Sequence, residues 1–135
     1  MKNILVVIGG GRANGNTMQL ADSFIAGAKE AGHQVEKISL LKEEVKGCLG
    51  CNACRFGKPC IQKDDFHEMI PKIKAADLIV FASPLYFWTI SSRLKAFIER
   101  LEESRKRQSR VREKQKWRQR EQGQNRDRKN RFSGF

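Results

Sequence analysis

The chain has 135 residues and a formal net charge of +12, from 27 Lys and Arg against 15 Asp and Glu side chains, and this length predicts one domain of ordinary size. Residues 1–100 hold 14 basic and 10 acidic side chains, a net of +4, whereas residues 101–135 hold 13 and 5, a net of +8. This asymmetry excludes a uniformly basic nucleic-acid-binding domain, and the apolar runs of the first part exclude a fully disordered chain.

Neither export nor a membrane location is expected. The N-terminal apolar run from Ile4 to Ile8 is shorter than the core of a signal peptide and is followed by glycines. No run approaches the roughly 20 apolar residues that cross a membrane. We therefore expect a cytoplasmic protein, in which the four cysteines are thiols or metal ligands rather than disulfides.

The first 41 residues predict a strand, a helix and a second strand. Residues 3–8 are a short run of branched apolar residues ending at three glycines, which is typical of a buried parallel strand. A helix is predicted from Asn16, which forms a capping-box pattern with Gln19, to Gly32, a typical C-terminal residue. Residues 35–41 predict a strand whose charged side chains suit the edge of a sheet.

Residues 65–101 predict a helix, a strand and a further helix. Asp64 and Asp65 are typical capping residues at a helix start, and this short helix runs toward Ala75. The strand Leu78–Ala82 is apolar throughout, is expected to be buried on both faces, and stops at a proline. Thr89, Ser91 and Ser92 are candidate N-caps of the last helix. The apolar face of that helix is formed by Leu94, Phe97, Ile98 and Leu101.

The first motif, at residues 9–17, lies between the first strand and the start of its helix. Backbone N–H groups, the positive end of the helix dipole and the Arg12 guanidinium would converge there on an anion such as phosphate. The loop has neither a Walker sequence nor G-x-G-x-x-G spacing, and a glycine turn without a ligand is the alternative. The predicted phosphate-binding residues are Gly9, Arg12, Asn14, Asn16 and Thr17.

The second motif follows the third strand. In an open parallel sheet with the flavodoxin-like order 2-1-3, the carboxyl ends of strands one and three flank a ligand crevice, so the two motifs would face each other. Three consecutive aromatic residues so close after a proline cannot all lie on one buried face. Beside a phosphate site, they suit a ligand that has a flat ring and a phosphate group. The predicted ring-binding residues are Ser83, Pro84, Leu85, Tyr86, Phe87 and Trp88.

The third motif is a group of four cysteines spaced C-x2-C-x2-C-x5-C, with basic residues nearby that favour thiolates. Thiolates at this short spacing could surround a [4Fe-4S] cluster. Zinc is a weaker alternative, because its four-cysteine sites are usually two separated pairs, and reduced or redox-active thiols are a third. The predicted metal ligands are Cys48, Cys51, Cys54 and Cys60.

Together these motifs resemble the flavodoxin-like NAD(P)H-dependent FMN reductases, including the iron-sulfur flavoproteins. The family's first loop, Gly-Ser-Pro-Arg-x-x-Gly-Asn-Thr, is matched except that Gly10 and Gly11 replace Ser and Pro. Its second loop, Ser-Pro-x-Tyr-Phe, is matched at residues 83–87 and runs along the isoalloxazine edge in the family. The cysteine spacing also resembles that of the iron-sulfur flavoproteins. The resemblance covers residues 1–100, as an incomplete α/β domain with helices on both faces of the sheet.

The resemblance implies an oxidoreductase that transfers electrons from NAD(P)H through FMN to a small-molecule or protein acceptor, with a [4Fe-4S] cluster as a possible relay. It also implies a homo-oligomer. No side chain is predicted to act as a general acid or base. The alternative is a flavin-free remnant or an interaction protein whose basic tail binds nucleic acid or an acidic partner.

The basic tail, residues 101–135, has no apolar run that could be a parallel strand and is expected to be helical or disordered. Family members continue with two further strand-helix units, so we favour a truncated or frame-shifted reading over a basic extension that uses Trp117 to bind nucleic acid, or a solvated helix. Without those units, the strand Leu78–Ala82 is expected to be an exposed edge.

Overall fold

The structure is a computed structural model in which residues 1–101 are described; the predicted tail beyond Leu101 lies outside the described residues. Its centre is a parallel sheet of order β2-β1-β3, made by β1 (Asn3–Ile8), β2 (Gln34–Ser39) and β3 (Leu78–Ala82). The predicted strands and the 2-1-3 order are therefore confirmed. Both neighbours of β1 run parallel to it, because each is reached through a crossover helix.

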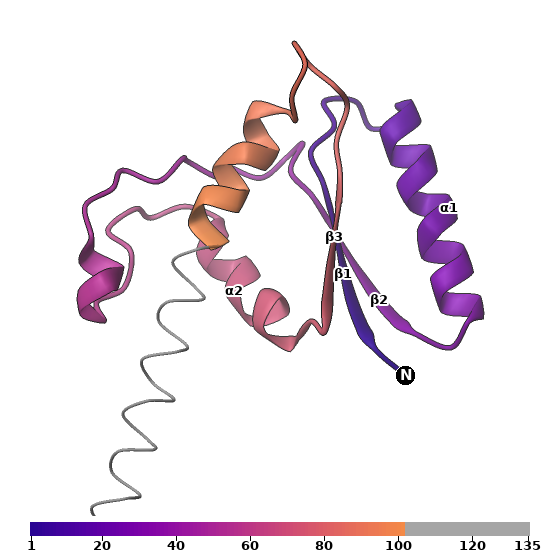
Figure 1. Cartoon of the computed structure of the whole chain (residues 1–135), viewed down its shortest axis with the longest axis horizontal. Helices are drawn as coiled ribbons and strands as arrows, with labels where there is room; N and C mark the ends of the chain where they lie inside the picture. The colour runs from indigo at the N-terminus through magenta and orange to yellow at the C-terminus, as the bar shows by residue number, and fades with distance from the viewer. Residues whose placement is uncertain (102–135) are drawn as a thin grey trace, which may run out of the picture.

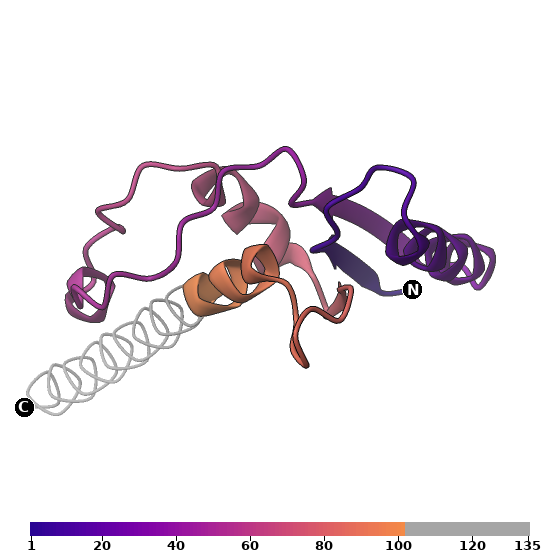
Figure 2. The same ribbon diagram turned by 90° about the horizontal axis from the view of Figure 1, so that it is seen from above.

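Helices cover both faces of the sheet. Helix α1 (Asn16–Glu30) lies on one face, and α2 (Phe66–Ala75) lies on the other together with an unlabelled helix at residues 92–101, drawn in orange in Figures 1 and 2. We call this element the last described helix. The segment between β2 and α2 extends away from the sheet and contains the short 3-10 helix η1 (Ala53–Phe56), which the sequence did not predict. None of the helices within residues 1–101 is long and apolar enough to cross a membrane.

The core follows from the alternation of side chains along β1. Leu5 and Val7 point to the α2 face, while Ile4, Val6 and Ile8 point to the α1 face, and all five are buried. On the α2 face they join a cluster with side chains from β2, α2 and the last described helix. On the α1 face they meet two buried side chains of α1. This double burial explains why β1 reads as a continuous apolar run.

One predicted helix start is corrected by the structure, and two are confirmed. Asn16 is the first residue of α1 rather than its cap, because Gly15 takes the N-cap position without a side-chain hydrogen bond. Gln19 donates through Nε2 to the Asn14 carbonyl at 3.4 Å, so no capping box forms. Asp65 is the N-cap of α2 as predicted, although its side chain makes no cap hydrogen bond. Ser91 does cap the last described helix, since its Oγ accepts the Leu94 N–H at 3.3 Å.

Strand β3 is an exposed edge of the described sheet. Its apolar side chains suggest burial on both faces, but Leu78 is 50% and Phe81 is 42% exposed. The burial on both faces predicted from the sequence is therefore wrong, and the exposed edge expected from the strand order is confirmed. The opposite edge, β2, carries polar residues, including Glu36 and Lys37, which suit solvent.

Candidate functional site

Two loops that are far apart in the sequence meet at the carboxyl end of the sheet. The glycine loop, residues 9–15, leaves β1 beside the end of β3, and the Gly9 N–H donates to the Ala82 carbonyl at 2.8 Å. The aromatic loop, residues 83–90, begins at that point. A Cβ placed on Gly11 would lie 3.7 Å from the Tyr86 hydroxyl oxygen. The two predicted motifs therefore lie side by side on one rim, at the top of Figure 1.

Gly9 brings the glycine loop close to the last described helix. A Cβ at this position would lie 2.6 Å from Ser91 Oγ and 2.7 Å from Leu94 Cβ, and both of those residues are buried. A larger residue would therefore push β1 away from the helix, so the glycine is required by close approach of the backbone rather than by a special dihedral angle.

The start of α1 provides the electropositive part of the rim. The helix has no acidic residue in its first turn and no side chain capping its N-terminus. Arg12 is exposed, lies with its Nε 3.9 Å from where a Gly15 Cβ would be, and makes no hydrogen bond or ion pair within residues 1–101. Thr17 is half-buried beside Gly10, and Asn14 and Asn16 are exposed. Helix dipole and guanidinium thus act on one small region, which fits a phosphate.

The aromatic loop ends in a tight hairpin. The Tyr86 N–H donates to the Thr89 carbonyl at 2.9 Å, and the Thr89 N–H donates back to the Tyr86 carbonyl at 3.1 Å. Phe87 and Trp88 form its tip with φ of 46° and 67°, a left-handed conformation that costs a bulky residue about 1–3 kcal/mol. Their side chains are 96% and 89% exposed. Strain combined with exposed rings is typical of a segment shaped for a ligand rather than for the core.

Ser83, Pro84 and Leu85 form the base of this loop. The Ser83 hydroxyl accepts the Ser91 N–H at 2.9 Å and donates to the Pro84 carbonyl at 2.8 Å, so it braces the loop against the last described helix. Leu85 is exposed, whereas Ser83 and Pro84 are half-buried. Of the predicted ring-binding residues, Leu85 to Trp88 are thus the ones that present exposed side chains at the rim.

A hollow of about 590 Å³ continues from the rim down the α1 face of the sheet. Asn16, Thr17 and Ser83 lie at its rim end, and α1 and β3 form its walls. The walls carry exposed apolar side chains, including Leu20 and Phe24. The hollow therefore joins the predicted phosphate-binding residues to an apolar surface, which is the usual composition of a site for a cofactor with a ring.

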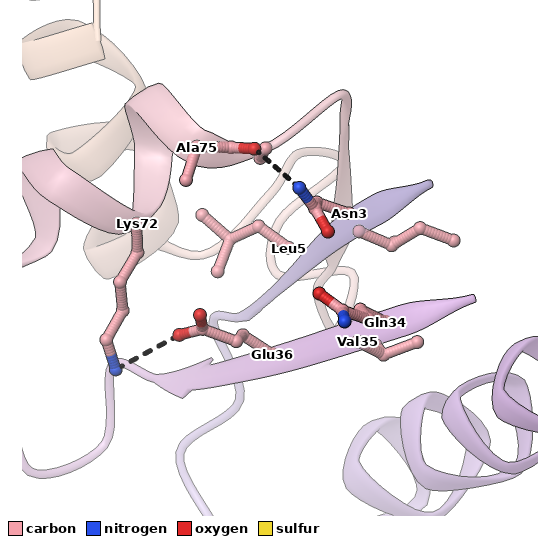
Figure 3. Close-up of a pocket in the computed structure, with 9 residues that line it drawn as sticks. Asn3, Leu5, Gln34, Val35, Glu36, Lys72 and Ala75 are labelled. Atoms are coloured by element: carbon pink, nitrogen blue, oxygen red, sulfur yellow. Dashed lines mark hydrogen bonds and ion pairs between the residues drawn. The ribbon is translucent and has the colours of Figure 1, made fainter. Parts of the chain in front are cut away.

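A second hollow, of about 220 Å³, lies at the amino end of the strands, opposite the rim (Figure 3). Three of its polar side chains make contacts within the fold: Lys72 Nζ lies 3.5 Å from Glu36 Oε2, and Asn3 Nδ2 donates to the Ala75 carbonyl at 3.4 Å. None of the predicted site residues lines this hollow. We interpret it as a gap in the packing between α2 and the strands β1 and β2.

The cysteine loop, residues 47–60, carries the four predicted metal ligands as thiols. Cys48 and Cys51 are exposed, and Cys54 and Cys60 are half-buried. The Gly50 N–H donates to Cys48 Sγ at 3.4 Å. Within residues 1–101, no three side chains of the metal-ligating types gather at one point. The residue types fit a cluster or zinc, but the thiols as placed do not form the predicted four-cysteine site.

The chain is similar to known proteins over most of its length. The family model for NADPH-dependent FMN reductases matches residues 2–120. The chain belongs to this family. It is similar to an iron-sulfur flavoprotein of Archaeoglobus fulgidus, with 38% identity over 71% of this chain and 47% of the relative. It is also similar to one of Methanocaldococcus jannaschii, with 36% identity over 72% of this chain and 50% of the relative. The chain spans about half the length of the curated relatives it matches.

Solved structures show the same fold. The NAD(P)H:quinone oxidoreductase from Methanothermobacter marburgensis aligns with a TM-score of 0.62 and 20% identity, over 73% of this chain and 52% of that one. The RosB structure with bound 8-demethyl-8-formylriboflavin-5′-phosphate aligns with the same TM-score and 19% identity, over 76% of this chain and 42% of that one. The predicted flavodoxin-like class of this FMN reductase family member is therefore confirmed.

One buried polar pair in this family member was missed by the sequence analysis. Arg100 Nη1 and Nη2 donate to the Asp64 carboxylate at 2.8 and 3.3 Å, and both side chains are 0% exposed. Burial raises the pKa of Asp64, but the hydrogen bonds from Arg100 and the Lys46 backbone, with the Arg100 charge, outweigh it and hold the pKa below its ordinary value. The signal was available: Arg100 follows Leu94 and Phe97 at spacings of three on the apolar face.

Proposed function

We propose that the chain is the FMN-binding part of an NAD(P)H-dependent oxidoreductase. The observation that carries this proposal is the contact between the two loops, where Gly11 approaches the Tyr86 hydroxyl. A phosphate site and an aromatic hairpin on one rim of a parallel sheet suit a flavin with a phosphate handle. The family membership supports the same reading.

The glycine loop would hold the phosphate of FMN. Arg12 brings a fixed positive charge, and the start of α1 brings backbone N–H groups, so a dianion gains charge-assisted hydrogen bonds there. Asn14, Asn16 and Thr17 add side-chain donors from the same loop and helix turn. These groups select for a phosphate and would bind a flavin without one more weakly.

The aromatic loop would orient the ring. Tyr86, Phe87 and Trp88 present flat, exposed faces, and the hairpin bridge between Tyr86 and Thr89 holds them at the rim. When bound, FMN supplies the redox chemistry, by accepting a hydride from NAD(P)H and passing electrons to an acceptor. The protein's part is to bind, to orient and to limit solvent at the ring. We propose a small-molecule or protein acceptor, and a cytoplasmic homo-oligomer.

A [4Fe-4S] cluster on the cysteine loop is a second, separate part of the proposal. Four cysteines at short spacing support it, as do relatives named iron-sulfur flavoproteins. The thiols would have to be drawn together, so the loop would change conformation on loading. Anaerobic reconstitution followed by iron and acid-labile sulfide analysis tests this. Bound zinc, or thiols that stay metal-free, would contradict it.

Flavin titration of the full chain tests the main proposal. FMN should bind and give flavin absorption, whereas Arg12→Ala should weaken FMN roughly 10- to 100-fold, since a hydrogen bond to a charged group contributes about 1.5–3 kcal/mol. Riboflavin, which lacks the phosphate, should bind Arg12→Ala and the parent equally. Arg55→Ala, an exposed arginine of the cysteine loop, is the matched control. Equal losses for FMN and riboflavin, or a chain that binds no flavin, would contradict the proposal.

A further inference from the structure

The stem of the cysteine loop is held together by acidic side chains instead of a strand ladder. The Glu44 N–H donates to Asp65 Oδ2 at 2.6 Å, and the Lys46 N–H donates to Asp64 Oδ2 at 2.9 Å. One backbone bond joins the same two segments, from the Asp65 N–H to the Glu44 carbonyl at 3.1 Å. The residues that enter the loop are therefore fixed to the residues that leave it by two adjacent carboxylates.

Arg100 ties both sides of this stem to the last described helix. Besides its two bonds to Asp64, Nη1 donates to the Lys46 carbonyl at 3.1 Å. Its Cζ lies 4.7 Å from the centre of the Phe66 ring, so an aromatic face covers the guanidinium. The forked geometry of arginine allows one side chain to bind a carboxylate and a carbonyl together, which lysine cannot reproduce.

The same helix also holds the first cysteine. Glu99 Oε2 accepts the Cys48 N–H at 3.1 Å, and Glu99 Oε1 is paired with Lys95 Nζ at 3.0 Å. A Cβ on Gly47 would lie 3.1 Å from Glu99 Oε2, so the backbone there runs close against the helix. Two successive residues of the helix, 99 and 100, thus contact the start of the cysteine loop.

The other end of this helix supports the rim. The Ser91 N–H donates to Ser83 Oγ, and Leu94 packs where a side chain on Gly9 would lie. From Ser91 to Arg100 an α-helix rises about 14 Å. One rigid element therefore contacts the aromatic and glycine loops with its first turn and the cysteine loop with its last (Figure 1).

We propose that Arg100 and Asp64 are positioning residues, which fix the cysteine loop on the last described helix and so at a set distance from the rim. A buried ion pair is a poor source of stability, because desolvation opposes it, and an apolar pair of similar volume can support a fold equally well. What an apolar pair cannot do is bind the N–H and the carbonyl of Lys46. This role does not depend on flavin or cluster binding.

Hydrogen exchange and thiol alkylation of the full chain, read by mass spectrometry, test the proposal. The test variant is the double change Asp64→Leu with Arg100→Met, which replaces the pair by apolar side chains. The matched control removes the exposed ion pair of Asp22 and Lys37, whose atoms lie 2.7 Å apart, by Asp22→Leu with Lys37→Met. A further variant, Arg100→Lys, keeps the charge and loses the fork.

The double variant should retain slow amide exchange in β1 while exchange at the Lys46 N–H rises about tenfold or more, because its acceptor Asp64 is gone. Exchange at the Cys48 N–H should rise as well, because Arg100 no longer fixes the loop where this N–H meets Glu99. Iodoacetamide should modify Cys48 faster, and Arg100→Lys should shift exchange in the same direction. The control pair should leave the loop unchanged. The proposal would be overturned if amide exchange at the cysteine loop were as slow in either variant as in the parent chain. Loss of protection in β1 of the double variant would also overturn it, because the pair would then support the whole fold.

Discussion

The two faces of the sheet differ in how completely they are covered. On the α2 face, two helices enclose a cluster of nine buried residues within the described part of the chain. On the α1 face, one helix encloses five, and the hollow of about 590 Å³ lies beside it. A helix about 10 Å wide covers roughly two strands spaced 4.8 Å apart. One helix therefore does not cover β3. The apolar side chains of β3 are less buried by residues 1–101 than their composition would suggest.

The largest effect on stability should come from the α2 face, which we call the closed face; the α1 face is the open face. Phe97 is fully buried and meets the Phe66 ring edge to face at 5.5 Å, so Phe97→Ala should lower the free energy of unfolding by about 3–5 kcal/mol. Phe24→Ala on the open face should lower it by only about 1 kcal/mol, because Phe24 is already partly exposed. Urea denaturation followed by circular dichroism measures both. Equal losses would remove the contrast between the faces.

Acid should weaken the closed face first. The pKa of Asp64 is lowered in the folded chain, so the unfolded chain binds the proton more readily, and stability falls as pH falls. The contribution is complete above the ordinary pKa of 3.8 and is lost as the pH drops through the lower folded value. Asp64→Asn should flatten the stability profile in this window. An unchanged slope in urea denaturation from pH 5 to pH 2 would assign the acid sensitivity to other carboxylates.

The rim should gain stability when its strain is removed. Trp88→Gly replaces a left-handed tryptophan in the hairpin tip and should raise the free energy of unfolding by about 1 kcal/mol. The same change should weaken FMN binding, because it removes an exposed aromatic face from the proposed ring site. Thermal unfolding and flavin titration measure the two effects. Leu85→Gly, at an exposed position without positive φ, is the control and should not be stabilising.

The smallest effect on stability is expected at the open edge. Leu78→Lys should change the free energy of unfolding by less than about 0.5 kcal/mol but reduce self-association, because a charge on an edge strand opposes pairing with another chain. Gln34→Lys, at the polar β2 edge, should leave association unchanged. Sedimentation velocity compares them. If both variants associate as the parent does, the β3 edge is not the surface responsible.

The sequence predicted local features well and distant contacts poorly. The run at residues 3–8 and the strand Leu78–Ala82 were found because their signals lie within a few neighbouring residues. Asn16 was misplaced by one position, because the extended backbone of Gly15, not a side chain, ends the loop. Asp64 looked like a cap, since its partner Arg100 stands 36 residues further on. The spacing of the cysteines likewise suggested a shared site that the loop conformation does not bring together.

By itself, the sequence determined the element order and the two loops, because periodicity and turn residues are local properties. The strand order 2-1-3 was expected from the resemblance to flavodoxin-like proteins. Only the tertiary structure decided that Gly11 meets Tyr86, that Arg100 binds the stem of the cysteine loop, and that β3 lies exposed. Such contacts depend on how helices and strands pack in space, where a few ångströms separate a bound partner from an open surface.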